Sequence, residues 1–176
     1  MATSVETPTR YEVSPGSSLT VEARSTLHAV RANATGLTGY VIAGWNPDGS
    51  LATAPAAVMH VEFSLDQVRS GNAIQDREML KMTDAARFPK AAADLRSIEL
   101  IAPPNRYKAS GEITLVGRAR TYGGEFAIAN AGDSVTVDGE LSIDIRDFGL
   151  RPPNLLILKV DPILRIRLRL VARKAA

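Results

Sequence analysis

The chain has 176 residues, enough for one domain that buries an apolar core without help from a metal or a disulfide. It contains no cysteine, which excludes disulfides, thiol catalysis and cysteine-ligated zinc or iron–sulfur sites. Its 21 Lys and Arg residues against 19 Asp and Glu give a net charge of only +2, and no aromatic residues interleave with the arginines of the last strand, so nucleic-acid binding is not indicated.

Residues 1–10 are polar and are expected to form a flexible tail ahead of a single domain that extends to residue 176. They lack the basic start and apolar run of a signal peptide, and no later stretch reaches the length of a membrane-spanning helix. The chain as given is therefore expected to be cytoplasmic.

In the first half of the chain, apolar and polar residues alternate with the period of a half-buried strand. The alternation is clear over residues 19–24 and 59–65, with a weaker candidate strand at 40–43. The pattern lapses over residues 72–88, where apolar residues surround a charged run, and this segment is predicted to be helical up to Pro89.

In the second half, long alternating runs cover residues 107–115, 135–145 and 164–170, with weaker candidates at 98–101 and 125–129. Turn sequences such as Asn46-Pro47-Asp48-Gly49 separate the runs, and connections this short favour antiparallel pairing. About eight strands with one apolar face each predict an all-β domain. The alternation alone leaves two architectures open, a two-sheet sandwich and a closed barrel.

The sequence offers no convincing catalytic or metal-binding set. The two histidines, His28 and His60, have no ligand-type residue at metal-binding spacing, and no nucleophile elbow or phosphate-binding glycine loop is present. We therefore predict no catalytic residue, no metal and no cofactor. An enzyme acting on a small hydrophobic substrate stays open as an alternative, in which Asp147 and His28 would converge inside the cavity.

The last strand carries Arg165, Arg167 and Arg169 at alternating positions. A solvated strand face is the preferred interpretation. A structural or interaction barrel that uses these arginines on an acidic partner or a membrane surface is the third hypothesis. A homodimer formed through an exposed strand edge is also left open.

Several blocks, read in order, resemble the YceI family of polyisoprenoid-binding, lipocalin-like proteins. They are residues 11–24, 58–65, 70–80, 87–89, 111–117, 146–150 and 160–162. The resemblance covers most of the chain and implies an eight-stranded antiparallel barrel with a lumen for a long isoprenoid chain. Ala91 to Ala93, Pro162 and the short run from Arg151 to Lys159 depart from the family pattern, which bears on the width of the lumen and the identity of the ligand.

The expected function is binding, sequestration or transport of a polyisoprenoid or similar lipid inside the barrel. Residues expected to line the lumen or its helical cap are Phe63, Met79, Leu80, Met82, Leu115, Phe126 and Phe148. Arg77 and Arg146 lie in family-like blocks and are the candidates for a charged headgroup, with a structural ion pair to a nearby carboxylate left open as the alternative for each. Members of the family are often exported, which the resemblance sets against the expectation of a cytoplasmic protein.

Overall fold

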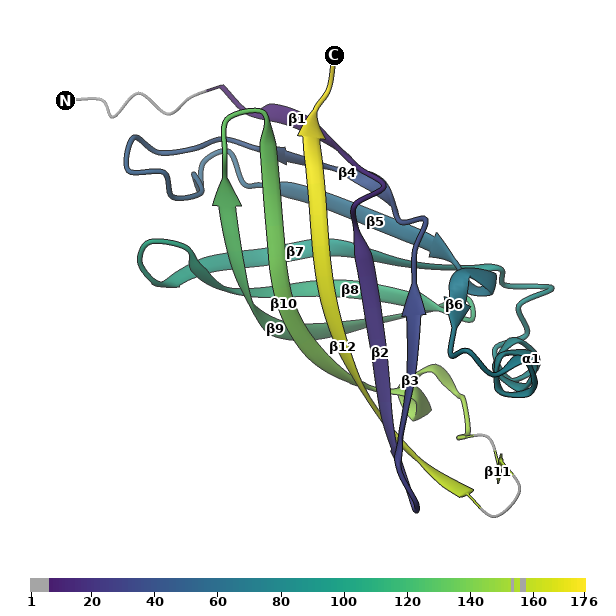
Figure 1. Ribbon diagram of the computed structural model, residues 1–176. Coiled ribbons are helices and arrows are strands. Elements are labelled where there is room, and N and C mark those ends of the chain that lie inside the picture. Colours follow the sequence, from purple (N-terminus) through teal and green to yellow (C-terminus); the bar gives the residue numbers. More distant parts are fainter. Residues whose placement is uncertain (1–6, 153, 156–157) are drawn as a thin grey trace.

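Alternating apolar residues along the chain fold into an antiparallel barrel whose interior they fill (Figure 1). The computed structural model describes residues 7–152, 154–155 and 158–176. The strands are β1 (Thr9–Val13), β2 (Ser18–Ser25), β3 (Ala29–Ala34), β4 (Thr38–Ala43), β5 (Val58–Ser64), β6 (Val68–Arg69), β7 (Lys90–Ala102), β8 (Arg106–Leu115), β9 (Arg118–Asn130), β10 (Ser134–Asp144), β11 (Asn154–Leu155) and β12 (Leu158–Lys174). The helices are α1 (Ala73–Met82) and the 3₁₀ turns η1 (Leu65–Gln67) and η2 (Ile145–Phe148).

Eight strands close the barrel in the order β1-β4-β5-β7-β8-β9-β10-β12, with β12 returning to β1. The long strand β12 changes partner along its length, because it pairs with β2 over its first half and with β1 near its end. Ser17 bonds to β12 at the point where the partner strand changes. Its hydroxyl donates to the carbonyl of Val171 at 3.1 Å and accepts from the amide of the same residue at 2.9 Å. The closed barrel predicted from the resemblance is confirmed.

The β9–β10 ladder runs only from the Asn130–Val135 pair to the Glu125–Glu140 pair. Nearer to η2, the Tyr122 side chain bridges the two strands instead: its hydroxyl lies 3.2 Å from both the amide and the carbonyl of Asp144. It also donates to the carboxylate of Asp147. The Tyr122 side chain therefore connects β9 to the end of β10 where the backbone pairing between the two strands stops.

The two ends of the barrel differ, and we name them by what lies there. The closed end holds the start of β1, the C-terminus and the loop around Trp45, and the helix end holds α1, η2 and the β2–β3 turn (Figure 1). One buried cluster, which includes Tyr11, Trp45 and Tyr107, fills the closed end, and a second cluster, which includes Leu115 and Phe148, lies at the helix end.

The structure extends several of the predicted elements. Thr9 and Arg10, expected in the tail, begin β1 and pair with β4, whereas residues 1–6 lie outside the described part of the chain. The predicted helical segment is confirmed as α1 followed by turns. Strand β3 had no clear alternation signal and was not predicted. Over the described ranges, no helix has the length and apolarity needed to cross a bilayer.

Candidate functional site: an apolar cavity at the helix end

An apolar cavity of about 190 Å³ lies inside the barrel near α1. Its walls are the inward side chains of β2, β5, β7, β8, β10 and β12, and they include Phe63, Ala91, Ala93, Leu115, Ile143 and Ile166. Among the described residues of this lining, Thr83 alone has a polar side chain, and its hydroxyl donates to the carbonyl of Met79 at 2.9 Å. No ionisable side chain lies among the described residues that line the cavity, so its environment suits a hydrocarbon.

Helix α1 caps the cavity. Asn72 begins the helix, because its side-chain oxygen accepts from the amides of Ile74 at 3.0 Å and Gln75 at 3.2 Å. The side chains of Met79 and Met82 on this helix form part of the cavity lining. Methionine side chains are flexible and adapt to guests of different shape, so this wall of the cavity is deformable.

Two smaller apolar cavities continue the interior toward the closed end. The middle cavity, of about 80 Å³, shares Val61, Ala93, Ile113, Leu141 and Leu168 with the large one. The upper cavity, of about 50 Å³, shares residues with the middle one, Met59 and Phe126 among them. The three cavities therefore follow one another in a row that favours an elongated guest over a round one.

Phe126 lies where the middle and upper cavities meet, because it lines both of them. Its ring lies along the barrel wall, where a Cβ added at Gly139 would overlap the ring and one added at Gly124 would come within 3.2 Å of it. Two glycines on neighbouring wall positions thus allow the ring to lie flat against the backbone. The position of the Phe126 ring therefore decides how much room a guest has between the middle and upper cavities.

The upper cavity ends at a sealed group of aromatic residues. Trp45 is 4% exposed and its indole NH donates to the hydroxyl of Tyr11 at 3.1 Å. The hydroxyl of Tyr107, a residue that is 2% exposed, accepts from the amide of Leu51 at 2.8 Å. Because these polar atoms are paired, their hydrogen bonds offset the cost of burying them when the aromatic residues seal the closed end.

The structure brings most of the predicted lumen residues to the interior. Phe63, Met79, Met82 and Leu115 line the large cavity, and Phe126 lines the other two. Leu80 packs against the helix-end cluster and is not among the residues that line the large cavity. Their role in binding a ligand stays a prediction.

Phe148 is placed differently from the expectation that it lines the lumen. It is 1% exposed and packs in the helix-end cluster, with its ring stacked on Tyr122 at a centroid distance of 6.0 Å. The 3₁₀ turn η2 explains the difference, since a residue in such a turn no longer follows the inside–outside alternation of a strand. Phe148 is a core residue that holds the Tyr122 side chain in place.

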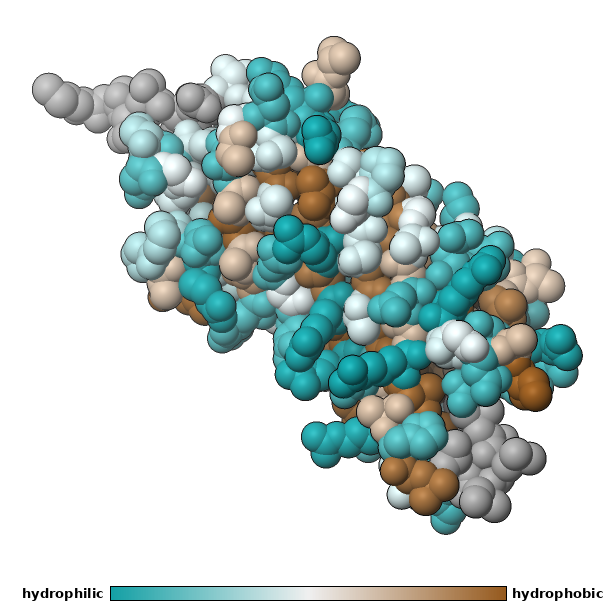
Figure 2. All heavy atoms as spheres, in the orientation of Figure 1, coloured by the Kyte–Doolittle hydropathy of each residue, from teal (hydrophilic) through white to brown (hydrophobic). Residues whose placement is uncertain are grey.

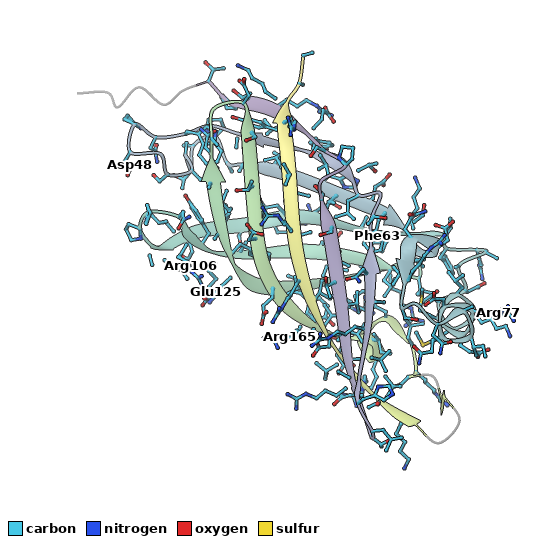
Figure 3. The ribbon with its side chains drawn as sticks, in the orientation of Figure 1. Asp48, Phe63, Arg77, Arg106, Glu125 and Arg165 are labelled. Carbon is cyan, nitrogen blue, oxygen red and sulfur yellow. The ribbon has the colours of Figure 1, made fainter. Side chains whose placement is uncertain are left out.

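The two predicted headgroup arginines do not converge. Arg77 points away from the barrel on the outer side of α1 (Figure 3). Arg146 is exposed, and its guanidinium pairs with Asp144 through contacts of 2.7, 3.0 and 3.1 Å. That hydrogen bonding holds the pKa of the Asp144 carboxyl below its usual value. Arg146 therefore acts as a partner of Asp144, the alternative to a headgroup role.

Ala91 and Ala93 were noted in the sequence as departures from larger residues. Both line the large cavity, and their small side chains leave part of that space unfilled. The strand β12 residues Leu164 and Ile166 also line it and were not singled out as ligand-binding. Leu164 and Ile166 alternate with the arginines of the same strand and therefore face the opposite side of the sheet. This alternation was the signal that could have identified them.

The arginine strand forms a charged lattice on the outer wall. Arg165 and Arg167 pair with Glu140 at 2.8 and 3.3 Å, and Arg169 pairs with Asp138 at 3.1 Å. Figure 3 shows the labelled Arg165 and the pair formed by Arg106 and Glu125 on this wall. The arginines already have acidic partners, which fits a solvated strand face better than a docking site for an acidic partner.

The proposed pairing of Asp147 with His28 does not form a site. His28 is exposed in the β2–β3 turn and is absent from the cavity linings, whereas Asp147 accepts from the Tyr122 hydroxyl. His60 lies on the outer wall, where its Nδ1 is 2.7 Å from Asp94. No group of three His, Asp or Glu side chains in the described ranges could hold a metal ion.

Comparisons with known proteins agree with this architecture. The chain matches the model of the YceI-like domain over residues 11–172. No curated protein sequence matches it.

Several solved structures share the fold at low sequence identity. BcnA from Burkholderia cenocepacia is similar at a TM-score of 0.71 and 18% identity, covering 88% of this chain and 95% of its own. A polyisoprenoid-binding domain from Saccharophagus degradans, implicated in plant cell wall breakdown, gives 0.73 and 14% identity, covering 96% and 99%. A YceI protein from Campylobacter jejuni gives 0.66 and 13%, covering 84% and 86%.

Proposed function

Because the chain belongs to the YceI-like domain family, we propose that its barrel binds an elongated apolar lipid of the polyisoprenoid type and sequesters or transports it without chemical change. The observation that carries the proposal is the row of three apolar cavities that begins at α1. The Saccharophagus degradans relative, described as a polyisoprenoid-binding domain, supports the same class of ligand.

The size of the cavities favours a slender, flexible guest. A dry apolar cavity of about 150 Å³ holds one benzene ring, so the 190 Å³ cavity alone holds little more than that. A chain of several isoprene units would have to extend into the middle cavity and move the Met79 and Met82 side chains. Each buried CH₂ contributes about 0.8 kcal/mol, so every isoprene unit that enters adds roughly 4 kcal/mol before ordering costs.

The lining favours binding over catalysis. The large cavity offers a guest one hydroxyl, that of Thr83, and this hydroxyl is already engaged with the backbone of α1. An enzyme would need titratable groups within reach of the substrate, and none of the described residues around this cavity supplies one.

The test fills the large cavity from its wall with Ala93→Leu. The added methyl groups occupy space that is empty, so the free energy of unfolding should change by less than about 1 kcal/mol. Lipid extracted from purified protein and identified by mass spectrometry should fall at least tenfold, as should the affinity for added geranylgeraniol. The exposed β9 residue Ala119 provides the matched control, since Ala119→Leu adds the same groups outside the barrel.

Two outcomes would overturn the proposal. Wild-type protein that yields no lipid and binds none of farnesol, geranylgeraniol and solanesol would remove the apolar guest altogether. Equal lipid content in Ala93→Leu and Ala119→Leu would place the guest outside the cavity.

A further inference from the structure

The two most exposed large apolar side chains of the described residues lie at the helix end. Leu27, in the β2–β3 turn, is 70% exposed, and Ile74, in the first turn of α1, is 69% exposed. Figure 2 shows separate brown patches among teal at this end of the molecule. A single exposed apolar residue needs no explanation, but these two lie on different elements at the end that holds the large cavity.

Cations flank Leu27. Arg24 precedes the turn at the end of β2, and Lys159 lies beside it, because the amide of Thr26 donates to the carbonyl of Lys159 at 3.1 Å. Both side chains are in exposed residues, and neither forms an ion pair with a described carboxylate. The turn that carries Leu27 therefore has two cationic residues beside it, Arg24 and Lys159.

The same combination occurs on α1. Arg77 and Lys81 follow Ile74 by three and seven residues, which places all three on one face of the helix. The helix turns its other face, with Met79 and Met82, to the cavity. Both acidic residues of the helix are engaged: Asp76 accepts from the amide and the hydroxyl of Ser70 at 2.8 and 2.7 Å, and Glu78 lies 3.4 Å from Lys81. Arg77 is therefore the cation of this face that has no ion pair with a described carboxylate.

We propose that the helix end docks on an anionic lipid bilayer, with Leu27 and Ile74 inserted below the headgroups and the flanking cations in contact with them. An apolar side chain flanked by Lys or Arg is the pattern of an interfacial anchor, and each cation near an anionic surface adds to the attraction. The proposal rests on the proposed function, because an isoprenoid guest is held in membranes. Helix α1, which caps the cavity, would then face the bilayer from which the guest is taken.

A second copy of the chain fits this surface less well than a bilayer. A stable protein interface buries about 800 Å² per partner around a continuous apolar centre. Leu27 and Ile74 are instead two separate tips, each accompanied by cations that would face like charges in a symmetric pair. The proposal therefore commits to the bilayer.

The test measures partition of the full chain onto vesicles without isoprenoid. Vesicles of phosphatidylcholine with phosphatidylglycerol should bind the protein in a salt-sensitive manner, and pure phosphatidylcholine vesicles should bind it several-fold less. The double variant Leu27→Ser/Ile74→Ser should lower the partition coefficient on the anionic vesicles about tenfold or more, since it removes two apolar side chains from the interface.

The matched control changes two apolar residues at the opposite end. Leu100 and Ile101, at the end of β7, are 42% and 44% exposed, and Leu100→Ser/Ile101→Ser should leave the partition within twofold of the wild type. Equal partition of the two double variants would overturn the proposal, as would equal binding to charged and uncharged vesicles. A concentration-dependent dimer abolished by Leu27→Ser/Ile74→Ser would assign these residues to a second copy.

Docking and cargo binding are measured separately. The Leu27→Ser/Ile74→Ser variant, loaded with geranylgeraniol from detergent, should retain as much of it as the wild type. Loss of vesicle binding with retained cargo supports docking, and cargo binding without any vesicle binding overturns docking alone. Vesicle binding by a protein that holds no isoprenoid would instead count against the proposed function.

Discussion

The closed end and the helix end of the barrel are built from the same strands, but their side chains fill the interior to different degrees. At the closed end, Trp45, Tyr11 and Tyr107 are nearly fully buried with their polar atoms paired, and the remaining cavity is about 50 Å³. At the helix end, aliphatic and methionine side chains surround about 190 Å³ of empty space. The difference indicates that one end provides stability and the other provides room for a guest.

The largest expected effect tests this contrast through stability. Trp45→Ala removes a buried ring and leaves the Tyr11 hydroxyl without its donor, so it should lower the free energy of unfolding by about 3–5 kcal/mol. Phe63→Ala removes a half-buried ring that already borders a cavity, so mainly part of the transfer free energy of the ring is lost, about 1–2 kcal/mol. Urea unfolding of both variants gives the comparison. Equal losses would mean that the helix end is packed as tightly as the closed end.

Phe126 marks the boundary between the two ends, and its removal should shift that boundary. In Phe126→Ala the middle and upper cavities join, so a longer guest can extend toward Trp45. Two more buried carbons are worth about 1.6 kcal/mol, so the preference for solanesol over geranylgeraniol should rise by roughly tenfold or slightly more, as measured by competition binding.

Phe63→Ala is the control for this change in preference, because it also removes an aromatic ring from the interior but leaves the boundary unchanged. It should weaken both guests together. A preference that changes equally in the two variants would show that Phe126 does not limit the depth of the site.

The alternation of residues along the strands predicted which side chains face inward. It placed Val61 and Phe63 inside and Asp138 and Glu140 outside, because the side-chain period of a strand is a local property. The closure of the sheet into a barrel came from the resemblance, since two sheets and one closed sheet present the same alternation.

Contacts between distant segments were not predictable from the sequence. The loop that carries Trp45 seals one end by reaching Tyr11, which lies 34 residues away in the chain. Tyr122 bridges the opening between β9 and β10 by reaching Asp144 and Asp147, which no spacing in the sequence indicates. Arg146 was selected for a headgroup by its block, but its neighbour Asp144 occupies the guanidinium.

The smallest expected effect concerns the outer wall between the two ends. The hydrogen bond between His60 Nδ1 and Asp94, at 2.7 Å, raises the pKa of His60 above its ordinary value of 6.5, and Glu62 acts in the same direction. A raised pKa means that the folded state holds the proton more tightly. The resulting stability is fully present below pH 6.5 and is lost as the pH rises through the folded-state pKa.

Asp94→Asn should weaken this dependence, because the larger of the two acidic contributions is lost while Glu62 remains. The loss below pH 6.5 should be about 0.5 kcal/mol, because both side chains are partly solvated, and urea unfolding at pH values on either side of the transition measures it. Asp66→Asn, at an exposed carboxylate without a described ion pair, should leave the dependence unchanged. Affinity for geranylgeraniol should be unaltered in Asp94→Asn, since the residue carries its charge on the outer wall. A coupled change in affinity would mean that the strands β5 and β7 transmit strain to the cavity, and the contrast between the ends would then depend on the wall as well as on its contents.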